Sequence, residues 1–139
     1  MSIHYITFQA SVHATESDDR VKTALSLFLF ENKINETQTE GHFGNPIILL
    51  QGQIKGKDCT RFIDILKSSL PEYELEKLRN ERCERIDDEC CFHIRFDKQA
   101  AFEGRVRLAA TADTITAKIK IRAYPANYEK ALAAAEALL

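Results

Sequence analysis

The stretch FHIRFDKQAAFEGRVRLAATADTITAKIKIR, residues 92–122, decides the fold of this chain. Apolar and polar residues alternate over 92–97 at its start and over 115–122 at its end. Between these segments, Val106 and Leu108 repeat the alternation with two arginines. Alternation at every second residue is typical of a half-buried strand, so the stretch predicts three strands that share one apolar face.

The polar face of the three predicted strands is basic. Residues 92–122 hold seven Lys/Arg and three Asp/Glu, a balance of +4, whereas the whole chain carries −2 and the remainder therefore −6. Strand parity places on this face His93 and the cations Arg95, Arg105, Arg107, Lys118, Lys120 and Arg122. A positive sheet face favours an anionic partner, although a pI near 6.1 argues against a protein that coats DNA through its overall charge.

Length and composition indicate one domain, residues 1–139. With 45% hydrophobic and 29% charged residues, the chain resembles ordinary globular proteins. Its longest apolar run, 47–50, is far too short to cross a membrane, and the first residues lack a signal-peptide pattern. We therefore expect a cytoplasmic protein with no membrane partner.

The four cysteines form no CxxC pair and show no Cys/His spacing of a zinc site. We expect reduced thiols, no metal and no cofactor. The acidic pair Asp18 and Asp19 suits the positive end of a helix dipole, and the acidic run 87–89 suits a polar turn. Neither acidic group is expected to hold a divalent ion.

Periodicity also predicts the remaining elements. They are a strand over 4–13, a helix after Ser17, an irregular hairpin over 38–54, helices over 58–70 and 72–85, and a last helix capped by Asn127. Strands and helices are partly segregated, which predicts an α+β fold: a mostly antiparallel sheet with helices packed on one face. Four cations of the charged helix can extend the basic patch, but interleaved glutamates favour a solvated face; they are Lys77, Arg79, Arg82 and Arg85.

His42 is a candidate general base because Glu40 lies two residues before it on the same strand face. The sequence places no nucleophile and no third group beside it, so catalysis is not expected and the chain is not predicted to be an enzyme. Contact with a ligand, or bracing of the bend at Gly44 and Pro46, explains His42 better. Gly44 itself is expected to adopt a backbone conformation that other residues rarely enter.

Two motifs go beyond general patterning: TEGHFGNPI at residues 39–47 and DKQAAFEG at residues 97–104. With the element order, they resemble a small archaeal family described as predicted RNA-binding, exosome-associated proteins. The resemblance covers nearly the whole chain and implies an α+β fold like that of ribosomal protein L5, with RNA binding as the proposed role. It marks as functional-surface positions His42, Gly44, Asn45, Lys98 and Gln99.

The favoured hypothesis is a non-catalytic RNA-binding protein, accessory to RNA processing or degradation. Cations on the sheet face would hold phosphates, Tyr5 would stack a base, and Lys98 with Gln99 would add a cation and an amide at the strand ends. The expected partners are RNA, an RNA-processing protein complex and a second copy in a homodimer. The alternative is a protein-interaction or self-associating scaffold without direct RNA contact, because lysines and arginines also keep sheet faces soluble.

Overall fold

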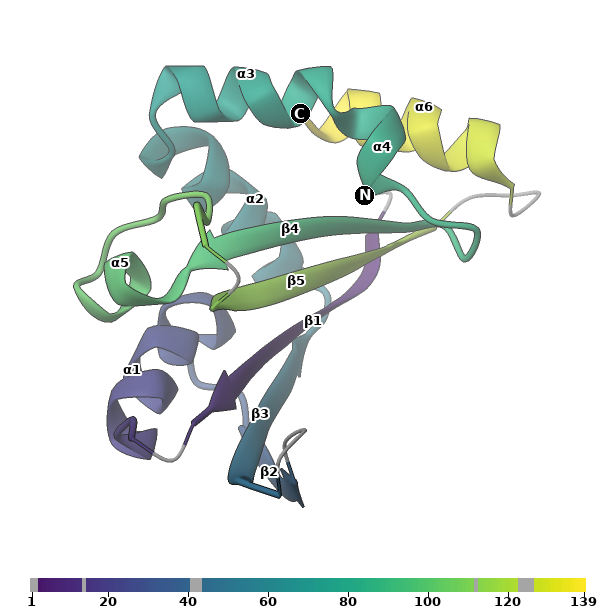
Figure 1. The fold of residues 1–139 in the computed structure, drawn as a ribbon. Helices are drawn as coiled ribbons and strands as arrows, with labels where there is room; N and C mark the ends of the chain where they lie inside the picture. The colour runs from purple at the N-terminus through teal and green to yellow at the C-terminus, as the bar shows by residue number, and fades with distance from the viewer. Residues whose placement is uncertain (1–2, 14, 41–43, 112, 123–126) are drawn as a thin grey trace.

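The computed structural model of the chain describes residues 3–13, 15–40, 44–111, 113–122 and 127–139. Its elements are shown in Figure 1. In chain order they are β1 (Ile3–Val12), α1 (Asp18–Leu29), β2 (Asn35–Glu40), β3 (Pro46–Ile54), α2 (Lys57–Ser69), α3 (Glu72–Asn80), α4 (Arg82–Arg85), β4 (Cys91–Asp97), α5 (Lys98–Phe102), β5 (Thr114–Ile121) and α6 (Tyr128–Leu138).

The strands among the described residues form one five-stranded sheet in the order β2-β3-β1-β5-β4. All four neighbouring pairs are antiparallel. The first strand of the chain therefore lies at the centre, between β3 and β5. The predicted α+β class with a mostly antiparallel sheet is confirmed.

Helices α1, α2 and α6 cover one face of this sheet. Phe8 of β1 stacks on Phe28 of α1 with ring centroids 5.4 Å apart, and Phe28 stacks on Phe96 of β4 at 4.6 Å. Phe62 of α2 meets the same rings edge-on. Aromatic contacts of this kind contribute about 0.5–1.5 kcal/mol each beyond the burial of their area. The apolar rows of β1, β4 and β5 all join this core, which leaves their polar rows on the opposite face.

The charged helix predicted over 72–85 is two helices, because the chain bends at Glu81 between α3 and α4. Both run beside α6 at the margin of the sheet (Figure 1). The Arg79 side chain donates to the carbonyl of Leu139 at 2.7 Å, and the Tyr128 hydroxyl donates to the carbonyl of Cys83 at 2.8 Å. These bonds attach the helix pair to the C-terminal helix, so its position beside β4 is well defined.

The strand predicted at Val106 and Leu108 is wrong. The segment makes a single bridge, from Leu108 to Phe96 on the outer edge of β4. The inner edge of β4 pairs with β5 instead. Residues 98–102 form the short helix α5, and the Asp97 carboxylate caps its start by accepting a hydrogen bond from the Gln99 N–H. Val106 alternates with polar neighbours because its side chain is buried against the core, and the segment does not join the sheet as a strand.

Two local predictions are confirmed, the cap at Asn127 and the backbone conformation of Gly44. Asn127 caps α6 by accepting from the Lys130 N–H at 2.9 Å, and Gly44 has φ +78°, in the left-handed region that favours glycine. All four cysteines are free thiols. No helix within the described ranges is both long and apolar enough to cross a membrane.

Candidate nucleic-acid interface

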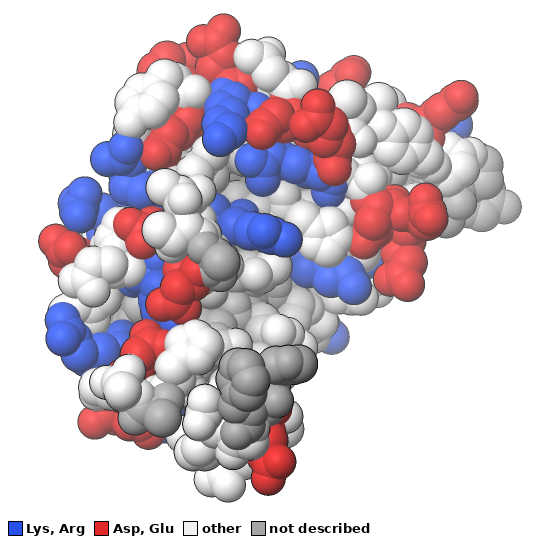
Figure 2. Space-filling model, in the orientation of Figure 1, with Lys and Arg blue, Asp and Glu red and all other residues white. Residues whose placement is uncertain are grey.

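The face of the sheet opposite the helices carries polar side chains in three rows. Register along the strands defines each row, because directly paired residues project to the same side. From β4 towards β3 the rows read Cys91, Lys120, Tyr5; then His93, Lys118, Thr7, Gln53; then Arg95, Thr116, Gln9, Gln51. Cations are therefore concentrated on β4 and β5, and uncharged polar groups on β1 and β3. Figure 2 shows Lys and Arg side chains gathered in the middle of this face, with acidic groups to the right.

We call Arg95, Lys118, Lys120 and Arg122 the basic sheet face. Within the described part of the chain, Arg95 and Arg122 have no ion-pair or hydrogen-bond partner for their guanidinium groups. Lys118 lies 3.6 Å from the Glu89 carboxylate, a loose and exposed pair. Lys120 donates to the backbone carbonyl of Glu89 and keeps its full charge. This face therefore retains positive charge that a phosphate can neutralise.

His93 sits in the middle row and is held by Asp87, with 2.6 Å between Nε2 and Oδ2. The other oxygen of Asp87 accepts from the N–H groups of Glu89 and Cys91 at 2.9 and 3.0 Å. Burial by itself would raise the pKa of Asp87, but the bonds from His93 and from these two N–H groups outweigh it and lower the pKa. The Asp87 carboxylate is thus occupied within its own turn.

Arg105 and Arg107 do not reach the basic sheet face, contrary to the prediction from strand parity. The Arg107 Nε donates at 2.9 Å to Glu74, a buried carboxylate of α3 that also accepts from the Leu108 N–H at 3.0 Å. The hydrogen bond and the charge of Glu74 raise the pKa of Arg107. Arg105 lies 3.4 Å from Glu103 on the surface. Arg107 therefore ties the 103–109 segment to α3, whereas Arg105 pairs only within the segment.

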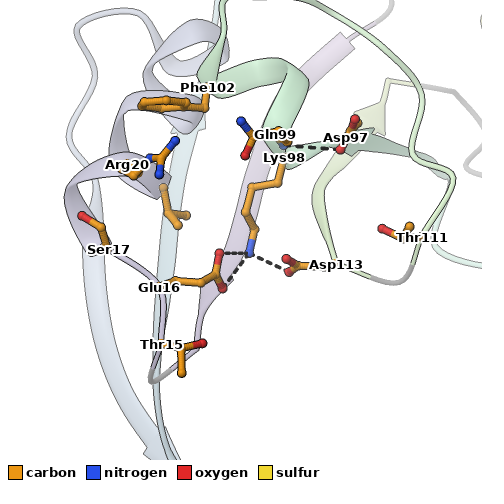
Figure 3. Close-up of a pocket in the computed structure, with 11 residues that line it drawn as sticks. Thr15, Glu16, Ser17, Arg20, Asp97, Lys98, Gln99, Phe102, Thr111 and Asp113 are labelled. Atoms are coloured by element: carbon orange, nitrogen blue, oxygen red, sulfur yellow. Dashed lines mark hydrogen bonds and ion pairs between the residues drawn. The ribbon is translucent and has the colours of Figure 1, made fainter.

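Lys98 also departs from the sequence expectation, because its ammonium is buried. It donates to the Ser11 carbonyl at 2.7 Å, to Asp113 at 2.6 Å and to Glu16 at 3.2 Å. Figure 3 shows Lys98, Glu16 and Asp113 among the residues that line a hollow between α1, α5 and the end of β1, which we call the Lys98 cleft. Gln99 lines the rim of this cleft and stays exposed, with its amide 3.4 Å from Glu103.

Two groups of side chains among the described residues have the spacing of metal ligands, but both already have partners within the fold. In His13, Glu16 and Asp113, both carboxylates pair with the Lys98 ammonium, which would compete with a metal ion. In Asp87, Glu89 and Cys91, the Asp87 carboxylate is already bound by His93 and by the N–H groups of Glu89 and Cys91, and burial raises the pKa of the Cys91 thiol.

The remaining predicted positions are spread out. Tyr5 is half-buried on the polar side of β1, opposite Lys120 of β5. Asn45 is exposed just before β3, at the far margin of the sheet from β4. His42 lies outside the described residues. The structure therefore brings Tyr5 to the basic sheet face and leaves Asn45 apart from it.

Sequence reasoning gave too little weight to a second feature, a hollow of about 400 Å³ on the outer edge of β4. We call it the β4-edge hollow. It is lined by Lys77, Glu84, Arg85, Ile86, Asp87, His93, Arg95, Leu108 and Ala109. The signal was present in the charges of residues 77–85, but their interleaved glutamates favoured a purely solvated helix. The hollow opens beside Arg95 and His93, so it continues the basic sheet face.

Comparison with known proteins gives matches over most or all of the chain. A family model described as RNA binding matches residues 5–121. The chain is 33% identical over 137 residues to the RNA-binding protein PAB1135 of Pyrococcus abyssi, covering 93% of this chain and 88% of that one. The crystal structure of protein AF2318 from Archaeoglobus fulgidus superposes with a TM-score of 0.89 at 32% identity, over 99% of both chains.

A DUF54 protein from Methanothermobacter thermautotrophicus is similar over the whole length as well. It superposes with a TM-score of 0.86 at 28% identity, covering 100% of this chain and 99% of the other. The family match spans most of the sheet, from Tyr5 in β1 to the end of β5. This chain belongs to the archaeal family whose model is described as RNA binding.

Proposed function

We propose that this chain binds single-stranded or looped RNA through its basic sheet face. The observation that carries the proposal is the uncovered polar face of the sheet, where Arg95, Lys118 and Lys120 lie on two neighbouring strands and Arg122 directly follows β5. Charged side chains there neutralise phosphates, and Tyr5 beside Lys120 offers a ring for a base. The family description and the name of the Pyrococcus relative support the same ligand class.

The proposed role is binding without catalysis, as an accessory to RNA processing or degradation. Association with an RNA-processing complex such as the exosome, and likeness to ribosomal protein L5, remain predictions from the family resemblance. Arg105 and Arg107 are not counted among the main phosphate contacts in this proposal, because they form ion pairs with Glu103 and Glu74. Lys98 is likewise matched by Glu16 and Asp113. Gln99, Asn45 and His42 are kept as secondary contact positions.

The test is to replace Lys118, Lys120 and Arg122 together by Glu. Their side chains point away from the core, so the fold should persist, as circular dichroism would check. Four phosphate contacts on a single strand predict a log–log salt slope of about −3 for the wild type, and loss of three contacts should bring the slope near −1. A fluorescence titration of labelled single-stranded RNA at several salt concentrations measures both.

The matched control reverses three exposed lysines elsewhere, Lys33, Lys55 and Lys57, which changes the net charge by the same amount. This variant should keep the wild-type slope, since a distant charge acts only through the screened overall field. Equal weakening by both triple variants would show that net charge, and not this face, governs binding. Absence of RNA binding by the wild type at low salt would remove the proposal.

A self-associating scaffold is the second candidate function, and one observation favours it. β2 is an edge strand whose six residues are all exposed. An edge strand offers unpaired N–H and C=O groups to a second copy of the chain. Sedimentation of the wild type and of a Gln38→Pro variant distinguishes the cases: a dimer through β2 would dissociate in the variant, since the register turns the Gln38 N–H away from β3 and Pro removes this edge donor.

A further inference from the structure

The β4-edge hollow exists because the outer edge of β4 is covered at both ends and open between them. At one end, the Asp87 N–H donates to the Cys91 carbonyl at 3.0 Å. At the other, the Asp97 N–H donates to the Arg107 carbonyl and the Ala109 N–H donates to the Arg95 carbonyl, both at 2.9 Å. The backbone between these two covers borders the hollow.

Backbone alternation puts a donor in this gap. Cys91, Arg95 and Asp97 direct their backbone groups to the outer edge, as their bonds show, whereas Cys90 bonds inward to Ile121 of β5. In an antiparallel strand the N–H and C=O of one residue point the same way. The Arg95 N–H therefore points to the outer edge too, and none of the backbone bonds among the described residues uses it.

Two cations beside this donor are unpaired. Among the described residues, neither the Arg95 guanidinium nor the Lys77 ammonium has a hydrogen-bond or ion-pair partner, and both line the hollow. The third cation, Arg85, is committed to the His93 carbonyl at 3.2 Å and to Glu81 at 3.4 Å. Asp87 is likewise bound by His93. Glu84 is the one remaining anion on the lining, so the hollow keeps a positive balance.

The rest of the lining is apolar. Ile86 is buried, Leu108 and Ala109 are half-buried, and together they form a wall beside the cations. A volume of about 400 Å³ lies in the range of small-molecule sites. A ligand that suits both parts has an anionic group and a flat or apolar body. Bare phosphate fits only half of this lining, and a nucleoside fits only the other half.

We propose that the β4-edge hollow binds one nucleotide of the RNA strand. Its phosphate accepts hydrogen bonds from the Arg95 N–H and guanidinium and from the Lys77 ammonium, and its sugar and base lie against Ile86 and Leu108. This inference rests on the proposed function, because it treats the hollow as a subsite next to the basic sheet face. It gives RNA a single anchored nucleotide in addition to diffuse phosphate contacts.

The first test uses adenosine 5′-monophosphate, adenosine and inorganic phosphate as probes, followed by amide chemical shifts of ¹⁵N-labelled protein. The monophosphate should shift the amides of Arg95 and Ala109 more than either fragment does at equal concentration. In a Lys77→Gln, Arg95→Gln variant, its affinity should fall about tenfold, the usual effect of removing charge-assisted bonds. Shifts centred elsewhere, or an affinity unchanged in the variant, would overturn the subsite.

Two further variants sharpen this test. Glu84→Gln removes the uncommitted anion and should tighten monophosphate binding about twofold, since a nearby like charge opposes the ligand. Lys33→Gln, Lys55→Gln changes the same number of charges as the double variant, far from β4, and should leave affinity unchanged. Weaker binding by Glu84→Gln would contradict the assigned position of the phosphate.

A titration with single-stranded RNA separates this inference from the proposed function. Weaker RNA binding by Lys77→Gln, a single variant that leaves Arg95 and the rest of the basic sheet face intact, supports the anchored nucleotide. RNA affinity unchanged in that variant, but lost on reversal of Lys118, Lys120 and Arg122, overturns the anchored nucleotide and leaves the basic sheet face in place. Monophosphate bound at Arg95 with no RNA bound by the wild type overturns both the proposed function and the assignment of this nucleotide to RNA.

Discussion

The Lys98 cleft and the β4-edge hollow are both rich in charged side chains, yet they differ in what those charges do. In the cleft, a buried ammonium is satisfied by two carboxylates and a carbonyl. In the hollow, Arg95 and Lys77 face solvent and no described residue pairs with them. The difference teaches that a cluster of ionic groups marks a ligand site only where its charges are left uncompensated. Four variants test this contrast, from the largest expected effect to the smallest.

Lys98→Met should have the largest effect, and on stability. It leaves Glu16 and Asp113 without their shared cation and the Ser11 carbonyl without a donor. Since both carboxylates are partly exposed, we expect a loss of about 2–3 kcal/mol in the free energy of unfolding, at the low end for broken buried pairs. Urea denaturation measures it. Lys55→Met, an exposed lysine, should change stability by less than about 0.5 kcal/mol. A variant as stable as the wild type would refute the structural role.

Arg107→Gln should come next, at about 1–2 kcal/mol, because it leaves the buried Glu74 carboxylate with the Leu108 N–H as its remaining partner. RNA affinity should stay within about twofold of the wild type, since the Arg107 charge is matched inside the fold. Denaturation and RNA titration are run on the same preparation. A large loss of affinity at unchanged stability would return Arg107 to the RNA interface.

Asp87→Asn should cost about 1 kcal/mol at neutral pH through weaker bonds to His93 and to the 87–91 turn. The pKa of Asp87 is lowered in the folded chain, so its contribution is present above the ordinary carboxyl pKa of about 3.9 and is lost as pH falls through the folded value. The stability difference between wild type and variant should therefore begin to narrow below about pH 3.9 and close as pH falls through the lower folded pKa. Denaturation at pH 7 and at pH 3 checks this, and a gap that widens at low pH would contradict it.

Arg105→Gln should have the smallest effect. Its pair with Glu103 is exposed on both sides, and such pairs contribute less than about 1 kcal/mol, often nothing measurable. Stability and RNA affinity should both match the wild type within error. An affinity loss as large as that of Arg95→Gln would show that the RNA path extends from the β4-edge hollow past Gly104.

Local pattern predicted the parts of the fold that depend on local chemistry. Phe92, Ile94 and Phe96 alternate because one side of β4 faces the aromatic core, and that parity alone places His93 and Arg95 on the open face. The same parity failed for Arg105 and Arg107. A four-residue alternation is too short to predict whether a segment joins a sheet, and β5, not residues 105–108, pairs with the inner edge of β4.

The positions that the sequence missed depend on distant partners. The burial of Lys98 requires Glu16, 82 residues earlier, and Asp113, 15 residues later. No local pattern around Lys98 contains that information, so it read as a surface cation. The β4-edge hollow likewise needs α3, α4 and residues 108–109 to meet one strand. Its charges are visible in the sequence, but their convergence is a product of the tertiary fold.

The central place of β1 has a consequence for how the chain is made. β1 is synthesised first, and its β3 neighbour soon follows, but its other neighbour, β5, ends at Ile121. During translation one edge of β1 stays unpaired until most of the chain has left the ribosome. Long-range pairing of this kind slows folding and leaves a strand edge unpaired and open to other chains. We therefore expect the nascent chain to be more prone to aggregation than the folded protein. Helix α1, which packs on β1 through Phe28 and Phe8, is the first element that can cover this strand during synthesis.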